Sequence, residues 1–241
     1  MPRGFLAVLS EPGEVTLDEF HDWYNNEHVP LRLNHIPAFL TGARFMAADG
    51  GNPGWIALYD IDSTTTFTDP SYTRLRENRS PREAALVKRL DILDRRTCEV
   101  VFESEVEKNK GSSTGLAVGN PTQWIVTHGL DIDTQEQNEN TTALAEGWQA
   151  INTVGAGAEG LLRSRLFRCI VGLKSGVRVA PGPEAQKIPQ YFVLHDAEPL
   201  LSGLKTLAAN KSSRLIISEG REWQIYRAYP CLAQGNLAPS S

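Results

Sequence analysis

The feature that most constrains the fold is a pattern of strands and helices that occurs twice along the 241 residues. Short apolar runs bounded by turn residues predict strands, and longer segments with helical spacing and start signals predict helices. The first half of the chain reads strand, helix, strand, strand, helix, strand, and the second half repeats this order. An internal repeat has to be recognised first, because it decides the fold of the whole chain.

The positions of the elements follow from apolar runs, turn clusters and helix start signals. Strands are expected at residues 5–9, 41–47, 55–61, 98–103, 124–130, 161–173, 191–195 and 222–229. Helices are expected from Thr16 to near His28, at 71–77, 80–90, 134–152 and 199–209. The helix at 80–90 has a start signal in which Ser80 is the N-cap, Pro81 lies in the first turn and Glu83 supplies an acid. Each half then has the ferredoxin-like order of elements.

One face of such an antiparallel sheet is covered by helices, so its other face must also be buried. We therefore predict an α+β fold in which two tandem ferredoxin-like repeats pack sheet to sheet around a central cavity, as an intrachain α+β barrel. The expected parts are an N-terminal repeat (1–104), a linker rich in Gly, Ser and Thr (105–121), a degenerate C-terminal repeat (122–230) and a flexible tail (231–241).

Composition and charge exclude several classes of protein. The net charge of −5 argues against a nucleic-acid-binding surface, which needs a basic patch. Cys98, Cys169 and Cys231 are too few and too scattered for a disulfide framework or a zinc site. No apolar run approaches the roughly 20 residues that span a bilayer, and the run before Pro12 is too short for a signal peptide. We expect a cytoplasmic protein without nucleic-acid or membrane partners, and a homodimer stays open.

Residues able to do chemistry gather between Thr16 and Phe45. A capping box of Thr16 and Glu19 starts a helix, and Pro30 is expected to kink or end that helix, because it removes a backbone donor. A stripe along this helix carries side chains that can exchange protons or hydrogen bonds: His21, Tyr24, Asn25 and His28.

A metal or a bound cofactor is not expected. On an intact helix His21 and His28 would be about 10.5 Å apart along the axis, too far to share one ion. No H-x-x-x-H or H-E-x-x-H motif occurs, and the glycines at 155–160 have the spacing of neither a phosphate loop nor a dinucleotide fingerprint.

The segment EFHDWYNNEHVP (Glu19–Pro30) resembles the F-x-x-W-Y-x-x-E-H-x-P signature of EthD-like dimeric α+β barrel proteins. Ala43–Phe45, Trp55–Asp60 and Phe67–Tyr72 are similar to that family's second strand, third strand and start of its second helix. The resemblance covers residues 5–105 well. It covers residues 122–230 by pattern only, because the second repeat has no W-Y-x-x-E-H motif.

The resemblance implies a superfamily of muconolactone isomerases, polyketide cyclases, anthrone-type decarboxylases, cofactor-free monooxygenases and haem-dependent chlorite dismutases. We therefore expect a cofactor-independent lyase or isomerase of secondary metabolism. It would decarboxylate, cyclise or isomerise a polyketide-like or phenolic molecule in a hydrophobic cavity. His28 would give or take the proton while Tyr24 and Asn25 orient the substrate. The residues expected to bind the substrate are Trp23, Arg44, Trp55, Tyr59, His128, His195 and Arg227.

Other functions stay open at this point. A haem-dependent chlorite dismutase-like or peroxidase-like enzyme needs a proximal histidine in the second half, where only His128 and His195 occur. A cofactor-free monooxygenase and a non-catalytic small-molecule binding protein are further alternatives. Each candidate residue also has a structural explanation: His28 can cap a helix end, and the tryptophans can be core residues.

Overall fold

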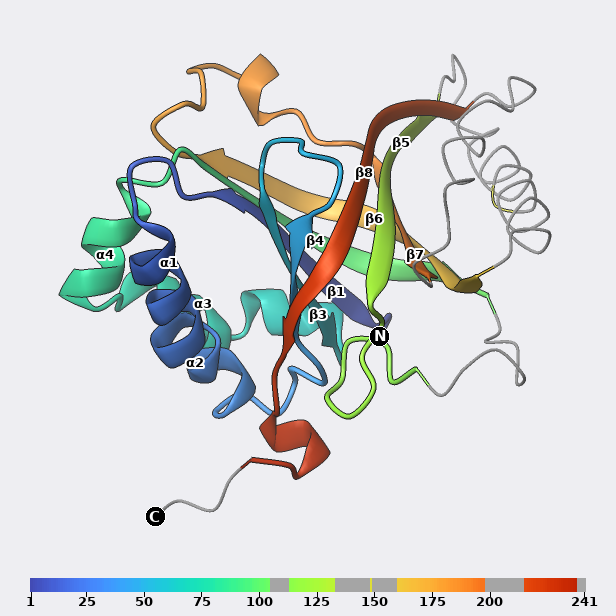
Figure 1. Ribbon diagram of the computed structural model, residues 1–241, viewed down its shortest axis with the longest axis horizontal. Coiled ribbons are helices and arrows are strands. Elements are labelled where there is room, and N and C mark those ends of the chain that lie inside the picture. Colours follow the sequence, from blue (N-terminus) through green and yellow to red (C-terminus); the bar gives the residue numbers. More distant parts are fainter. Residues whose placement is uncertain (105–112, 133–147, 149–159, 198–214, 238–241) are drawn as a thin grey trace.

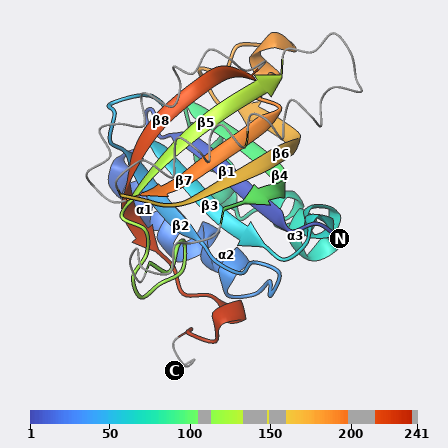
Figure 2. The same ribbon diagram turned by 90° about the vertical axis from the view of Figure 1, so that its right-hand side faces the viewer.

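The computed structural model describes residues 1–104, 113–132, 148, 160–197 and 215–237, in which eight strands form one closed barrel (Figures 1 and 2). Around the barrel the strands follow the order β1-β3-β2-β8-β5-β7-β6-β4, and β4 pairs with β1 to close the ring. All of these pairs are antiparallel. The strands are β1 (Gly4–Glu11), β2 (Ala43–Ala47), β3 (Trp55–Ile61), β4 (Ile92–Glu103), β5 (Trp124–Ile132), β6 (Leu161–Ser175), β7 (Tyr191–Ala197) and β8 (Leu215–Ala228).

The predicted fold class is wrong. Two repeats packed sheet to sheet would leave two separate sheets facing each other. Instead, β2 pairs with β8 and β4 pairs with β6, so that strands from both halves form a single barrel. The physical reason is that the edges of two open sheets would leave backbone N–H and C=O groups unpaired, and closure pairs them. A strand does occur at each predicted position, although β4 and β8 begin well before the predicted residues.

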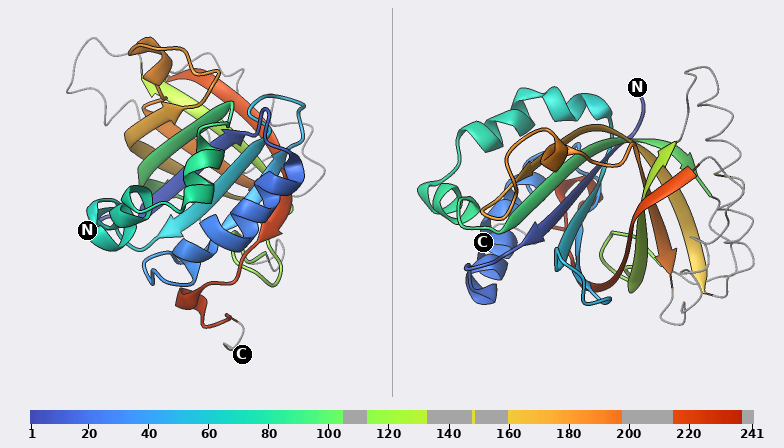
Figure 3. Two further views of the ribbon diagram at one scale, coloured as in Figure 1. Left: turned by 90° about the vertical axis from the view of Figure 1, so that its left-hand side faces the viewer. Right: turned by 90° about the horizontal axis from the view of Figure 1, so that it is seen from above.

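The described α-helices belong to the first half of the chain and lie outside the barrel against its strands (Figure 3). They are α1 (Leu17–Trp23), α2 (Pro30–Leu33), α3 (Pro70–Glu77) and α4 (Pro81–Val87), with a π-helical turn η1 (Tyr24–His28) and 3₁₀ turns η2 (Thr64–Thr68), η4 (Glu184–Gln186) and η6 (Leu232–Gln234). Several predicted features lie outside the described residues. They are the helices at 134–152 (Trp148 apart) and 199–209, residues 105–112 of the linker, the glycines at 155–157 and residues 238–241 of the tail. Within the part described, no helix is long and apolar enough to cross a membrane.

Two predicted helix starts are confirmed by their side-chain caps. The Thr16 hydroxyl accepts a hydrogen bond from the Glu19 backbone N–H, and the Ser80 hydroxyl accepts one from the Glu83 backbone N–H. The Thr16 capping box is only half formed, because the Glu19 carboxylate pairs with Arg89 and does not return to the helix start. The caps therefore hold the first turns of α1 and α4, from which the site residues below are presented.

Alternating side chains of the strands contribute to two large cores and to a smaller third one, in which Leu130, Leu166 and Val193 pack with Trp148. Those that point into the barrel pack its middle with rings and aliphatic groups, among them Phe5, Phe45, Phe167, Phe192 and Trp223. Those that point outward from the first-half strands pack under the helices with Phe20, Trp23, Tyr24, Phe39 and Tyr72. The middle of the barrel is thus filled, and the predicted central cavity is absent there.

Ion pairs cross the barrel interior near both ends. The Arg96 guanidinium on β4 binds Asp94 at 2.6 Å and reaches Glu219 on β8 at 2.7 Å. At the other end, Arg165 on β6 binds Asp60 on β3 at 2.7 Å. Neither pair joins neighbouring strands. Each therefore links the first half of the chain to the second through the interior.

The described part of the expected tail, residues 231–237, contacts the barrel. The Cys231 side chain is buried. Its thiol and the Gln234 side-chain amide both donate hydrogen bonds to the Leu40 carbonyl.

Replacing Arg96 with Ala should lower the free energy of unfolding by about 3–5 kcal/mol, because it leaves the buried Asp94 carboxylate without its main cation. Arg168 pairs with Glu99 at the surface, and Arg168→Ala should change the free energy by at most about 1 kcal/mol. Urea denaturation measures both. Equally small effects for the two variants would contradict a stabilising role for the ion pairs of Arg96 inside the barrel.

Candidate active site

Two cavities lie on opposite faces of the same strands. One of about 60 Å³ lies outside the barrel, between its strands and the helices, and His28 lines it. The other, of about 430 Å³, lies at one end of the barrel interior. Alternation along β4 explains the arrangement, because Arg95 lines the first cavity while Asp94 and Arg96 line the second. Of the residues predicted from the sequence, His28 and Tyr59 line the first, which we treat as the candidate active site.

The π-helical turn η1 places His28. The Val29 backbone N–H donates to the carbonyl of Tyr24, five residues earlier, at 3.0 Å. Pro30 follows directly and has no N–H to continue the α-helical ladder. The predicted disruption near His28 is confirmed as a π turn between α1 and α2. Such turns are frequent at functional sites, because the extra residue shifts the side chains that follow around the helix axis.

His28 and Glu83 form a buried pair. Nδ1 of His28 lies 2.8 Å from Oε1 of Glu83, and the two side chains are 14% and 3% exposed. Burial, followed by the positive charge of Arg32, lowers the pKa of His28 to about 4 despite the nearby Glu83. Burial acts to raise the pKa of Glu83, but the hydrogen bond and charge of His28, together with the positive charges of Arg32 and Arg79, hold that pKa below its ordinary value.

At neutral pH these directions give a neutral imidazole beside an ionised carboxylate. Because a carboxylate can only accept, the ring donates its one proton from Nδ1 to Glu83. Nε2 of His28 is then the proton acceptor. Glu83 therefore selects the tautomer in which His28 can act as a base.

The cavity beside His28 is strongly cationic. Arg32, Arg76, Arg79 and Arg95 line it, and no Asp or Glu is among its lining residues. Arg95 donates through Nε and Nη2 to the Tyr72 hydroxyl, at 3.1 and 2.9 Å. Burial and then the neighbouring Arg95 lower the pKa of Arg76. This surplus of positive charge favours an anionic ligand.

The aromatic residues predicted for the site also meet at this cavity. The rings of Trp23 and Tyr24 lie 4.6 and 5.1 Å from the His28 ring. Tyr59 lines the cavity. Its buried hydroxyl has no hydrogen-bond partner among the described residues, and burial raises its pKa. Tyr59 therefore offers an unused hydrogen-bond donor to a ligand.

Arg44, Asn25 and Trp55 lie next to the cavity in a separate cluster. The buried Arg44 guanidinium lies over the Tyr24 ring at 4.0 Å, and its nitrogens contact Asn25 Oδ1 at 3.4 Å and His21 Nδ1 at 3.2 Å. The Trp55 ring borders it at 5.4 Å. Among the described residues, no carboxylate pairs with Arg44. Asn25 is occupied by Arg44 and by the Tyr229 hydroxyl, so this cluster holds η1 on the barrel and does not face His28.

The remaining predicted binding residues lie elsewhere. Arg227 is exposed, with its guanidinium 5.1 Å from the Tyr229 ring. His128 on β5 and His195 on β7 belong to the side of the barrel opposite β1, with ring centroids 5.3 Å apart. Nδ1 of His195 bonds the Ser164 hydroxyl at 2.7 Å. Neither ring nitrogen of His128 has a hydrogen-bond partner within the part of the chain that the structure describes. Burial lowers the pKa of His128 to about 4 and that of His195 to about 3.

Sequence reasoning missed the residues that give the cavity its charge. Glu83 was identified only as a helix start residue, and Arg32, Arg95 and Tyr72 were not identified. One available signal was the density of arginines between residues 74 and 82: Arg74, Arg76, Arg79 and Arg82. Two of these line the cavity.

The described residues do not fit a haem or a metal ion. A haem needs a protein ligand facing a space that holds the macrocycle. The larger cavity has no His, Cys, Tyr or Met in its lining, and the cavity with His28 and Tyr59 is too small at about 60 Å³. Among the residues with described placement, no group of His, Cys, Asp and Glu is arranged to hold a metal.

Comparisons with known proteins bear on the fold. No protein-family model matches the sequence. No curated protein matches it either. An anthrone oxidase-like protein superposes with a TM-score of 0.55 at 10% identity, over 100% of this chain and 97% of that chain. A chlorite dismutase-like protein superposes with a TM-score of 0.54 at 10% identity, over 94% of this chain and 96% of that chain. At this identity the likeness shows only that the fold is shared. Proteins with this fold include groups that the sequence resemblance named.

The buried neutral histidines predict a dependence of stability on pH. An unfolded histidine titrates near about 6.5, whereas His28 and His128 titrate at about 4 and His195 at about 3. Between these values the unfolded state binds more protons, so stability is full above about pH 6.5 and falls as the pH drops towards 4. Each histidine contributes up to about 1.4 kcal/mol per pH unit.

Urea denaturation between pH 4.5 and 7 measures this slope. His28→Gln should make the slope smaller, and the matched variant of the exposed His35, His35→Gln, should leave it unchanged. If His28→Gln and His35→Gln both show the same slope of stability against pH as the parent chain, the result would contradict a buried, neutral His28.

Proposed function

We propose that this chain is an enzyme that removes a proton from a phenolic or enolisable aromatic molecule at His28 and allows the resulting anion to react with O₂. The observation that carries this proposal is the His28–Glu83 pair at the wall of a cavity lined by arginines. A neutral base next to fixed cations favours an anion, since the base takes the proton and the cations stabilise the charge left behind.

Each residue has a role in the proton transfer. Nε2 of His28 accepts the proton of the substrate, and Glu83 stabilises the imidazolium through its hydrogen bond to Nδ1. Arg32 and Arg95 stabilise the negative charge from fixed positions, because hydrogen bonds to His28 O and to the Tyr72 hydroxyl hold their side chains. The unpartnered Tyr59 hydroxyl donates to a substrate oxygen.

The oxidation is balanced by O₂ alone. For a methylene that lies between two aromatic rings joined on their other side by a carbonyl group, as in an anthrone, R₂CH₂ + O₂ gives R₂C=O + H₂O. The carbon gives up four electrons, one oxygen atom becomes the carbonyl and the other leaves as water. The proton held by His28 is returned to that water, so the base is regenerated.

The size of the cavity limits how the substrate binds. About 60 Å³ holds a phenolic oxygen and its near surroundings, but not a fused ring system. Arg76 and Arg79 line the cavity and are exposed, so the cavity reaches the surface beside them. In the proposal the acidic end of the substrate enters towards His28 and its remainder extends past these arginines.

The base proposed here would also serve a decarboxylation, cyclisation or isomerisation, which the sequence led us to expect. The name of one solved structure with this fold, anthrone oxidase-like, supports the oxidative reaction as the choice. Oxygen uptake distinguishes the two classes, because a lyase or isomerase converts substrate without consuming O₂. The EthD-like resemblance of residues 5–105 agrees with either reaction.

Anthrone is the probe substrate, with O₂ uptake and quinone formation as readouts. His28→Gln should reduce kcat/KM by about 10²- to 10⁴-fold, because the proton acceptor is lost. Glu83→Gln should reduce it less, because the base remains but its tautomer is no longer fixed. His35→Gln, an exposed position, should leave turnover unchanged. Full activity of His28→Gln would contradict the proposal. Turnover without O₂ uptake would show that the enzyme catalyses a lyase or isomerase reaction and not an oxidation.

A further inference from the structure

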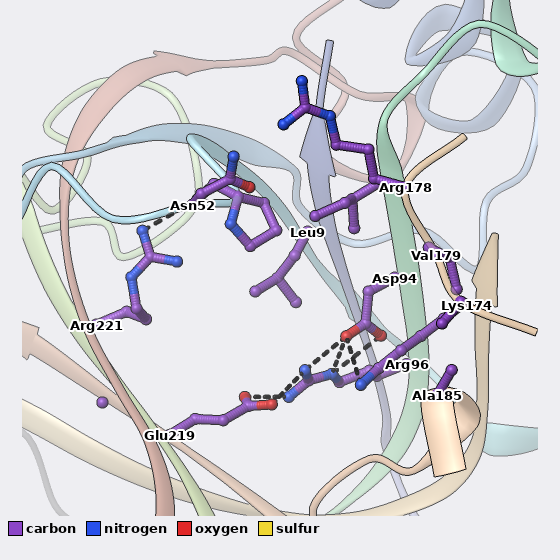
Figure 4. A pocket seen from close by; sticks show the side chains of 14 residues that line it. Leu9, Asn52, Asp94, Arg96, Lys174, Arg178, Val179, Ala185, Glu219 and Arg221 are labelled. Carbon is purple, nitrogen blue, oxygen red and sulfur yellow. Dashed lines mark hydrogen bonds and ion pairs between the residues drawn. The ribbon is translucent and has the colours of Figure 1, made fainter. Parts of the chain in front are cut away.

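We infer that the cavity at the barrel end binds a second ligand, a small carboxylate with an aromatic or aliphatic body (Figure 4). Its volume of about 430 Å³ lies within the range of small-molecule sites. It lies inside the barrel, across the strands from His28, and the proposed reaction does not use it. The proposal therefore stands on its own observations.

The carboxylates in the lining are already neutralised. Asp94 and Glu219 both bind the Arg96 guanidinium, which is 2% exposed. Lys174 adds a further positive charge 3.9 Å from Asp94. Figure 4 shows these contacts together along one side of the cavity. The two acidic side chains are thus held by cations and do not exclude a second anion.

Two further cations line the cavity, Arg221 at the left of Figure 4 and Arg178 at its top. Arg178 binds Asp91 through Nε at 2.8 Å, and Arg221 binds Asp49 through Nε and Nη2. Asp91 and Asp49 are not lining residues. Both Nη groups of Arg178 and the Nη1 group of Arg221 have no partner among the described residues, so they are available to an anion.

Apart from Asn52 and Gly220, the rest of the lining is apolar. It comes from β1, the β2–β3 turn, β4 and the segment between β6 and β7: Leu9, Pro53, Ile92, Val179, Ala180 and Ala185. Apolar walls bury a hydrocarbon body, and arginine N–H groups bind a carboxylate in a forked geometry. Together they specify an amphipathic carboxylate.

The test is isothermal titration calorimetry with 2-naphthoate. We expect one molecule bound per chain, and binding about tenfold weaker for the neutral 2-naphthylmethanol, which has the same ring system. Arg178→Gln should weaken naphthoate binding by a similar factor, because it removes a cation from the cavity lining. Urea denaturation of this variant separates the loss of binding from any loss of stability caused by leaving the buried Asp91 without its cation. Ala185→Phe should abolish binding by filling the space.

The arginines beside His28 could also attract naphthoate, so Arg79→Gln is the matched comparison. Binding within twofold of the parent value in Arg79→Gln, together with the loss in Arg178→Gln, supports the barrel-end site. Three results would overturn it: no naphthoate binding, equal binding of the alcohol, or weakening by Arg79→Gln that equals or exceeds that by Arg178→Gln. None of these results depends on whether His28 is catalytic.

Discussion

Strand pairing between the two halves of the chain closes the barrel, and the two large cores and both cavities depend on this closure. β2 pairs with β8, and β4 pairs with β6, so the edges of each half find partners in the other. With the edges paired, the strands present one face to the interior and one to the outside. The interior middle fills with aromatic rings, while ion pairs of Arg96 and Arg165 cross its two ends.

Because the strands are shared, one segment of chain serves two chemically different cavities. Along β4, Asp94 and Arg96 point to the barrel end, while Arg95 points to the cavity under the helices. On β6, Lys174 and Leu173 divide in the same way. Because side chains alternate between the two faces of a strand, the same strands can line one cavity on each face. The helices and the π turn then give only the outer cavity a base.

The sequence predicted local features better than their assembly. Apolar runs located every strand, the caps at Thr16 and Ser80 formed, and Pro30 marked the disrupted helix near His28. The pairing of strands between the two halves could not be predicted from the sequence. Pairing of edge residues such as Phe45 and Ile225 gives no signal in the local periodicity of apolar residues. Glu83 and Arg95 were missed for a similar reason, since only the fold brings them to His28.

The central claim is that Glu83 holds His28 as a neutral base with its proton on Nδ1. A ¹⁵N NMR titration of the His28 ring tests it most directly, because the chemical shifts of the two ring nitrogens report both tautomer and charge. The account predicts a protonated Nδ1 and an unprotonated Nε2 at pH 7, with titration near pH 4. An imidazolium at pH 7, or a neutral ring with its proton on Nε2, would contradict it.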